Sequence, residues 1–343
     1  MKYWGYIFCL MLIITGCSTS NNNIDNLELT KYFKVKFNTT KYLSMCVCND
    51  KMYALANDSD VYFVTDLKNK ITHSKKIPIE IDNPTSITFA EDNIYIIDVI
   101  NKNISMFNNE FKFIKRIALK HYPISSYIYG GNIYYVTDVL HNSTYRYVLL
   151  KENLRIHKTN ILFMGDSLNA LSLRQNLDLD NPHTLCFSGY EDYIYITKQN
   201  SDKRIVYKID DDSHIIWMKD SLWKPVEYNI QERAKSLDEY TDILSPYNYP
   251  INKIKLTKKP SICGLCNDKD GNVWIVSPIF DDASKLIIEI YSPDADLLKS
   301  FKIDAVPLEN LKISLSSNFL SLSYRENKHS YIQLYKLNWR LDK

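Results

Sequence analysis

Histidine and carboxylate side chains are the groups in this sequence that could most readily do chemistry. The chain has seven histidines, and two of them stand close to a proline in segments that begin an expected strand. Imidazoles and carboxylates that converge in a fold can bind a divalent metal ion or transfer protons. Because the sequence has no HxxxH pair or other local ligand spacing, it favours solvated loop residues, and neither a metal nor a cofactor is predicted. The residues in question are His121, His183, Asp98, Asp138 and His141.

The segment Cys263-Gly-Leu-Cys266 has the CxxC spacing used by redox enzymes and zinc sites. It lies on an expected strand, where positions three apart point to opposite faces, whereas a functional CxxC begins a turn or a helix. No second CxxC completes a set of four zinc ligands. Cys46, Cys48 and Cys186 also lie on expected strands. We interpret these cysteines as small buried hydrophobic residues, with a disulfide as the alternative.

Aromatic residues gather in one long stretch that also has a helical pattern. Rigid aromatic surface in a long loop can bind a ligand, a sugar or a partner protein. Within the stretch, Ile230, Ala234 and Leu237 recur at helical spacing, so we expect a helix that buries this apolar stripe, ending before Pro246. The aromatic candidates for a binding face are Trp223, Tyr228, Tyr240, Tyr247 and Tyr249.

The composition limits the class of protein. The 343 residues carry a net charge of +2, with 45% hydrophobic and 24% charged residues, which suits one large domain or two ordinary ones. The near-zero net charge gives no electrostatic case for a nucleic-acid partner. Only 8 residues are glycine and 26 are tyrosine. Scarce glycine argues against phosphate-binding loops, and abundant tyrosine favours strands over helices.

The first seventeen residues predict export and lipidation. A single charge, Lys2, precedes the apolar run Ile7–Ile14, which is shorter than the roughly 20 residues that span a bilayer and is typical of a signal peptide. The run ends in Ile14-Thr-Gly-Cys17, which resembles the lipobox of bacterial lipoproteins. The resemblance implies cleavage after residue 16 and acylation of Cys17; the alternative is an ordinary signal with an incidental cysteine.

Residues 17–30 then form a lipidated polar tether, and the expected location is the cell envelope. In the lipoprotein family, a residue such as Ser18 is compatible with sorting to the outer membrane. Which leaflet and which side of the membrane carry the protein stays open. The membrane is therefore a predicted partner, contacted through the lipid anchor.

Six copies of one pattern account for the rest of the chain. Each copy has short apolar runs separated by polar turns, and the neighbouring runs must pair as antiparallel hairpins. The second run begins at Lys51, Asn93 and Asn132 in the first copies, at intervals of 42 and 39 residues, which is the length of a propeller blade. An aromatic residue occupies the third place of this run in five of six copies, and we assign these aromatics to the core. They are Tyr53, Tyr95, Tyr134, Tyr195 and Trp274.

The repeats predict an all-β, six-bladed β-propeller of four-stranded antiparallel blades over residues 31–343, with one partly helical insertion. The last copy has three strands, and the run Tyr32–Phe37 has no blade of its own, so we expect it to close the ring at blade six. With the lipobox, the chain resembles the six-bladed propeller lipoproteins of Bacteroidetes, relatives of the NHL and TolB-like propellers. That resemblance covers nearly all of the mature chain and implies architecture rather than activity.

Two insertions, 163–181 and 223–259, fall on connections between an outer strand and the next inner strand. They are therefore expected on the same face of the ring. The favoured function is a lipid-anchored binding or assembly module with a protein or glycan partner on this face. The alternatives are a hydrolase or lyase at the channel mouth near His121 and His183, and a purely structural envelope protein.

Overall fold

The computed structural model describes most of the chain from Leu27 to Trp339. The described residues are 27–37, 43–48, 50–56, 60–82, 84–99, 101–123, 125–141, 144–168, 186–198, 203–222, 224–244, 258–308 and 311–339. In this part of the chain, no helix is both long enough and apolar enough to cross a membrane.

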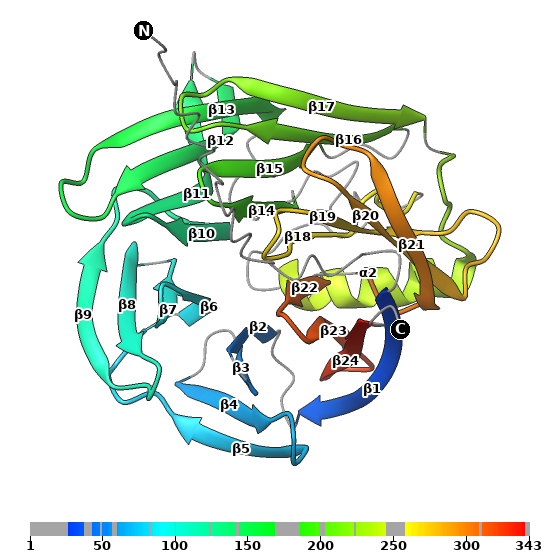
Figure 1. Ribbon diagram of the computed structural model, residues 1–343, viewed down its shortest axis with the longest axis horizontal. Coiled ribbons are helices and arrows are strands. Elements are labelled where there is room, and N and C mark those ends of the chain that lie inside the picture. Colours follow the sequence, from blue (N-terminus) through cyan, green and yellow to red (C-terminus); the bar gives the residue numbers. More distant parts are fainter. Residues whose placement is uncertain are drawn as a thin grey trace, which may run out of the picture.

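The strands form six separate four-stranded antiparallel sheets arranged in a ring, which confirms the predicted six-bladed propeller (Figure 1). The first three blades are β2 (Leu43–Cys48), β3 (Lys51–Ala56), β4 (Val61–Asp66), β5 (Ile71–Lys76); β6 (Pro84–Ala90), β7 (Asn93–Asp98), β8 (Asn103–Asn108), β9 (Phe113–Ala118); and β10 (Ser125–Tyr129), β11 (Asn132–His141), β12 (Thr144–Asn153), β13 (Thr159–Leu168). Blades four and five are β14 (Phe187–Tyr190), β15 (Tyr193–Lys198), β16 (Lys203–Ile209), β17 (Ile215–Leu222); and β18 (Gly264–Asn267), β19 (Val273–Pro278), β20 (Lys285–Tyr291), β21 (Leu297–Asp304). The sixth comprises β22 (Lys312–Leu315), β23 (Phe319–Glu326), β24 (His329–Trp339) and β1 (Leu27–Phe37).

Strand β1 closes the ring, as predicted, by pairing antiparallel with β24. The register runs from Leu27 opposite Trp339 to Phe37 opposite Ser330, with one irregularity between Lys31 and Phe33. The strand begins at Leu27 rather than at Tyr32, so it takes up the last residues of the stretch 17–30 that the sequence assigned to the tether. Leu27 and Phe37 are buried at the two ends of the strand, which anchors it along its whole length. This pairing gives blade six its fourth, outermost strand and joins the two ends of the described chain in one sheet.

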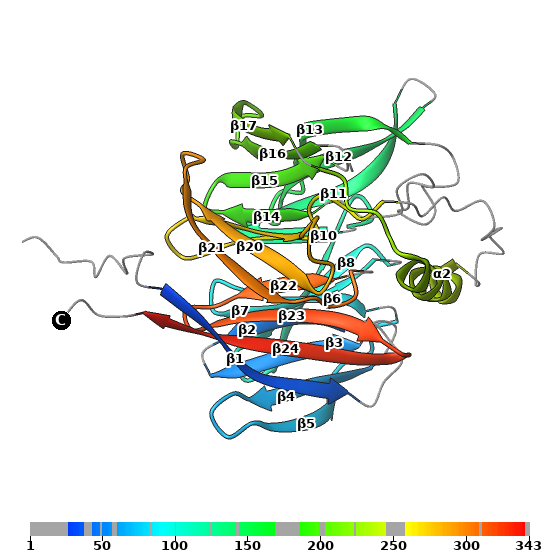
Figure 2. The same ribbon diagram turned by 90° about the vertical axis from the view of Figure 1, so that its right-hand side faces the viewer.

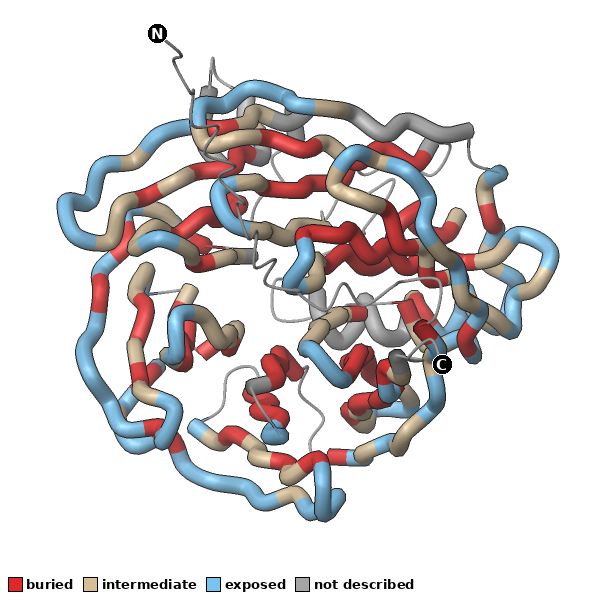
Figure 3. Tube along the Cα trace, in the orientation of Figure 1, coloured by how far each residue is buried: buried red, intermediate tan, exposed pale blue. Residues whose placement is uncertain are grey.

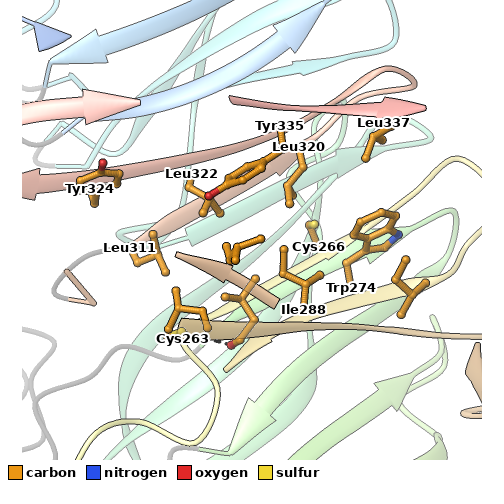
Figure 4. Close-up of a cluster of buried hydrophobic side chains, with 14 of the residues drawn as sticks. Cys263, Cys266, Trp274, Ile288, Leu311, Leu320, Leu322, Tyr324, Tyr335 and Leu337 are labelled. Carbon is orange, nitrogen blue, oxygen red and sulfur yellow. Dashed lines mark hydrogen bonds between the residues drawn. The ribbon is translucent and has the colours of Figure 1, made fainter. Parts of the chain in front are cut away.

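The core lies between neighbouring blades, where the second strands bury almost every side chain (Figure 3). All five repeated aromatics are buried, from fully buried Tyr134 and Tyr195 to Tyr53 at 5% exposed, which confirms their assignment to the core. Figure 4 shows one such cluster between blades five and six, where Trp274 and Cys266 face Leu320 and Tyr335. Each aromatic therefore joins two blades, and the ring is one continuous packed structure.

Some core tyrosines also hydrogen-bond across the gap between blades. The Tyr53 hydroxyl donates to the backbone oxygen of Asn109 at 3.4 Å, and the Tyr134 hydroxyl donates to Asp211 Oδ1 at 2.8 Å. In both cases, the acceptor lies in the turn between the third and fourth strands of the following blade. Lys151 forms an ion pair with the same Asp211 carboxylate. Burial, together with the Asp211 hydrogen bond, raises the pKa of Tyr134, so this phenol stays protonated as the donor.

The turns explain how the fold tolerates so few glycines. The β10–β11 hairpin turn uses Gly130 and Gly131, with φ of 59° and 71°. At the same place in blade two, Glu91 and Asp92 adopt φ of 48° and 59°. Two-residue hairpins of this kind need positive φ at both positions, which glycine or asparagine accommodates at least cost. The chain therefore accepts backbone strain where other proteins place glycine.

The insertions differ in part from the sequence prediction. Strand β13 continues to Leu168, so the outer strand of blade three takes up the start of the predicted insertion 163–181; the rest lies outside the described residues. The second insertion, 223–259, contains helix α2 (Ile230–Leu244), as predicted. Its two ends are tied together by a β-bridge between Glu227 and Lys258.

The orientation of α2 corrects the expected apolar stripe. Ile230 is 89% exposed and Ala234 is also exposed, whereas Ser236 is buried. The helix begins with a reciprocal cap, in which Glu232 N donates to Asn229 Oδ1 at 2.8 Å and Asn229 N donates to Glu232 Oε2 at 3.0 Å. The side of the helix that faces the propeller carries Glu232 and Lys235, which pair with Lys259 and with Glu326 of blade six, while Ile230 and Ala234 face solvent.

Candidate functional site

The structure places only some of the predicted site residues. Outside the described residues lie Cys17, His183, Trp223, Tyr247 and Tyr249. For Asp138 and His141 in β11, and for Tyr240 in α2, only the backbone is described. The three candidates with described side chains are Asp98, His121 and Tyr228.

Asp98 belongs to a turn and does not face solvent. It is 1% exposed at the end of β7, where its carboxylate accepts hydrogen bonds from Asn101 N at 3.0 Å and Asn101 Nδ2 at 2.9 Å. The same Asn101 amide also donates to Asp82 at 2.8 Å. The prediction of a solvated loop residue was therefore wrong for Asp98, because its carboxylate satisfies the donors of a tight β7–β8 connection.

His121 lies in the connection between β9 and β10 and is half-buried. Its neighbour Tyr122 is 47% exposed, with Lys102 Nζ 4.3 Å from the ring centroid. Among the residues with described side chains, no three His, Cys, Asp or Glu groups come together as a metal site. Within the part of the chain whose side chains are described, Asp98 and His121 therefore do not belong to a cluster of three such groups.

The CxxC segment has the buried, hydrophobic character expected of it. Cys263 and Cys266 are 6% and 8% exposed, and Cys263 Sγ lies 3.2 Å from the Val276 backbone oxygen. Desolvation raises the pKa of both thiols far above its ordinary value, so neither is a ready nucleophile or metal ligand. Their role is packing between blades four, five and six.

Tyr228 belongs to a cavity of about 210 Å³ where α2 meets blades five and six. The lining comes from α2, from the connection after β19, from the connection between β21 and β22, and from the end of β23. All these segments lie on the face of the ring that carries α2, which we call the insertion face. Figure 2 shows α2 on this face and the start of β1 on the opposite face.

One side of the cavity is apolar. It is formed by the chain between β21 and β22 and by residues near the end of β19. Pro278 ends β19 and Pro307 lies between β21 and β22, and each fixes its backbone φ. The two connections are joined by a hydrogen bond of 2.8 Å from Ala305 N to the Ser284 backbone oxygen. The main apolar lining residues are Pro278, Ile279, Leu286, Val306, Pro307 and Leu308.

The other side of the cavity is charged. Lys259, with a side chain only 6% exposed, forms an ion pair of 2.7 Å with Glu232, the residue that also caps α2. Lys235 pairs with Glu326 at 3.4 Å, and Lys285 lies beside it on the lining. The Lys259–Glu232 pair therefore holds the insertion together, and the Lys235–Glu326 pair joins it to blade six.

Two carboxylates at this site are each shared by two lysines. Glu326 lies 3.4 Å from both Lys235 and Lys34. Asp304 lies 2.8 Å from Lys285 and 3.2 Å from Lys31. Hydrogen bonds from these two lysines hold the pKa of Asp304 below its ordinary value, and Asp304 in turn raises the pKa of Lys285.

Sequence reasoning identified Tyr228 but missed the lysines and carboxylates of the cavity. They come from β1, α2, β20, β21 and β23, which are distant in sequence and meet only once the ring is closed. The signal that could have found them is the proline at position 307, since it marks a connection on the same face as the insertion.

Comparisons with known proteins returned solved structures of low sequence identity. No protein-family model and no curated protein matches the chain. Among solved structures, it is similar to a DUF4221-family protein from Bacteroides vulgatus, at 10% identity and a TM-score of 0.47, over 92% of this chain and 99% of that one. It is also similar to the calcium-binding protein regucalcin from Agrobacterium tumefaciens, at 8% identity and a TM-score of 0.47, over 92% and 96% of the two chains. BamB from Moraxella catarrhalis gives 7% identity and a TM-score of 0.39, over 90% and 100%.

At 7–10% identity and TM-scores of 0.39–0.47, these similarities transfer no activity to this chain. The protein is a six-bladed β-propeller, as its sequence resemblance implied.

Proposed function

We propose that this protein is a lipid-anchored binding module of the cell envelope, held to the membrane through Cys17 and presenting its insertion face to a partner protein. The lipobox-like end of the signal sequence supports the anchor. The cavity beside α2 supports the choice of face, because concave sites with a few convergent charges are where proteins bind ligands.

The observation that carries the proposal is the direction of β1. Its last residue, Phe37, pairs with Ser330, close to the β23–β24 turn where Glu326 lines the cavity. Its first residue, Leu27, pairs with Trp339 at the other end of this strand of eleven residues. The chain therefore enters the propeller on the face opposite α2 (Figure 2).

This direction limits where an anchor could hold the protein. Leu27 follows Cys17 by ten positions, a length of chain that spans at most about 36 Å when fully extended. Strand β1, with its eleven residues, covers a similar distance of roughly 36 Å between the two faces. An anchor at Cys17 would thus favour contact of the opposite face with the bilayer and leave the insertion face free.

The anchor is tested by fractionating cells that express the full chain or Cys17→Ser. We expect the wild-type chain in the membrane fraction and labelled by a fatty-acid probe, and the variant released and unlabelled. Membrane retention of Cys17→Ser would contradict the lipid anchor.

The binding face is tested with a photo-crosslinking residue placed at either of two exposed positions. One is Arg233 on α2, and the other is Lys269 in the β18–β19 turn of the opposite face. We expect a specific crosslinked envelope protein from position 233 and none from position 269. The reverse pattern, or equal crosslinking from both positions, would argue against the insertion face as the binding surface.

A further inference from the structure

We propose that the cavity beside α2 binds a carboxylate attached to a small apolar group, such as the last residue of a peptide or a small aliphatic acid. This inference rests on the proposed function in one respect, which is that the cavity lies on the same face of the propeller. It assigns to that face a ligand chemistry set by the volume of the cavity, its apolar side and the arrangement of its charges.

The volume limits the size of the bound group. Ligand pockets commonly measure about 300–1,000 Å³, whereas this cavity measures about 210 Å³. It therefore suits a group of amino-acid size and not a dinucleotide or an oligosaccharide. The apolar side, including Val306 and Leu308, suits an aliphatic side chain such as leucine.

The charges around the cavity favour an anion. Five lysines and three carboxylates form the ion pairs at this site, and Asp282 and Lys302 add one charge of each sign nearby. The lining itself holds three lysines and two glutamates, which leaves one excess positive charge. The lysines in these pairs are Lys31, Lys34, Lys235, Lys259 and Lys285.

Because Glu326 and Asp304 each contact two lysines, one lysine of each pair can turn to a ligand while the carboxylate keeps the other. Lys235 and Lys285 line the cavity, with side chains 46% and 38% exposed. An incoming carboxylate that pairs with Lys235 leaves Glu326 paired with Lys34. Lys285 can likewise turn to the ligand while Asp304 keeps Lys31. A carboxylate would thus gain two cationic partners without leaving a protein carboxylate unpaired.

The third lysine of the lining has a different role. Lys259 is almost fully buried, and its partner Glu232 is held by the cap of α2. Removing Glu232 would leave the buried Lys259 ammonium without its counterion, so this pair fixes the wall. The recognition of the ligand is assigned to Lys235 and Lys285, and the shape of the cavity to Lys259 and Glu232.

Binding is tested with the chain from residue 17, carrying Cys17→Ser so that no lipid interferes. The probe is a fluorescent tetrapeptide ending in leucine, made with either a free C-terminal carboxylate or a C-terminal amide. We expect the acid to bind about 10- to 100-fold more tightly than the amide, because the amide loses the charge-assisted hydrogen bonds. Equal affinity of acid and amide, or no binding of the acid, would overturn the proposal.

Matched variants place the site. Lys235→Met and Lys285→Met should each weaken binding of the acid by about threefold to tenfold, and should leave the amide unchanged. Lys302→Met removes a nearby lysine that does not line the cavity and serves as the control. Ala283→Trp should block binding by filling the space, since Ala283 is an exposed lining residue. Acid binding that survives Ala283→Trp and both lysine variants would refute this site.

Competition with 4-methylpentanoate identifies the source of the carboxylate. Displacement of the peptide by this acid supports a small-acid ligand, and peptide binding that the acid does not displace supports a peptide terminus. In both outcomes the bound group is a carboxylate attached to a small apolar group. The result is independent of the crosslinking experiment, because failure of the peptide to bind would remove this ligand while a crosslink from position 233 would still support the face.

Discussion

The salt bridge between Arg204 and Glu289 offers a direct test of how the blades are held together. Arg204 lies on β16 of blade four and Glu289 on β20 of blade five, and their side chains are 10% and 13% exposed. The perturbation is Glu289→Gln, which keeps the shape of the side chain and removes its charge. The Arg204 guanidinium then stays buried between two blades beside a neutral amide.

The expected cost follows from this burial. Removing one member of a buried ion pair costs about 3–5 kcal/mol, because the remaining charge keeps its desolvation penalty. An exposed pair contributes about 0–1 kcal/mol. Lys76 and Asp60, 77% and 56% exposed on blade one, form the matched surface pair, so Asp60→Asn is the control.

The assay is urea denaturation followed by circular dichroism, which gives the free energy of unfolding of each variant. We expect Glu289→Gln to lower this free energy by about 3–5 kcal/mol and Asp60→Asn by less than about 1 kcal/mol. Replacing both partners, with Arg204→Met and Glu289→Leu, should recover most of the loss, since no charge is then buried. A loss from Glu289→Gln no larger than that from Asp60→Asn would refute the reasoning.

Three further predictions concern packing, turns and thiols. A Cβ at Gly189 would overlap the ring of Tyr127 on the neighbouring blade. Gly189→Ala should therefore lower the free energy of unfolding, measured by urea denaturation, by about 1–3 kcal/mol. An unchanged midpoint of urea denaturation would contradict this contact. Replacing Glu91 and Asp92 by Asn-Gly should raise the melting temperature, because a positive φ costs about 1 kcal/mol of backbone strain at each of these two positions. An unchanged or lower melting temperature would count against strain in this turn. Desolvation raises the pKa of Cys263, so only a very small fraction of this thiol should be thiolate at pH 8. Its alkylation by iodoacetamide, followed by mass spectrometry, should therefore be slow until urea unfolds the chain. Rapid labelling of the native protein would contradict a buried thiol.

The repeat in the sequence was sufficient to predict the ring. Residues such as Asn93 and Asn132 mark the turn before each second strand, and the aromatic two positions later packs against the next blade. Local turn chemistry and alternation of apolar residues are encoded within each repeat, so they can be read without knowing the rest of the chain. The closing strand was predictable because a ring of blades needs a partner for its last edge.

The candidate site was predicted much less well, because it depends on contacts between distant segments. The spacing of Ile230 and Ala234 correctly indicated a helix, but the face of α2 that meets the propeller carries the residues that pair with Lys259 and Glu326. Nothing near α2 in the sequence identifies Glu326 as a partner. Asp98 similarly has the composition of a loop residue, and only the structure shows its carboxylate buried under a turn.

The central claim is that the protein is anchored through Cys17 with its insertion face directed away from the membrane. It is tested most directly by reconstituting the acylated chain in vesicles whose lipid headgroups carry a fluorescence quencher. One fluorophore is attached at position 235 on α2, and another at position 296 in the β20–β21 turn of the opposite face. We predict strong quenching at position 296 and weak quenching at position 235. Stronger quenching at position 235 would contradict the account.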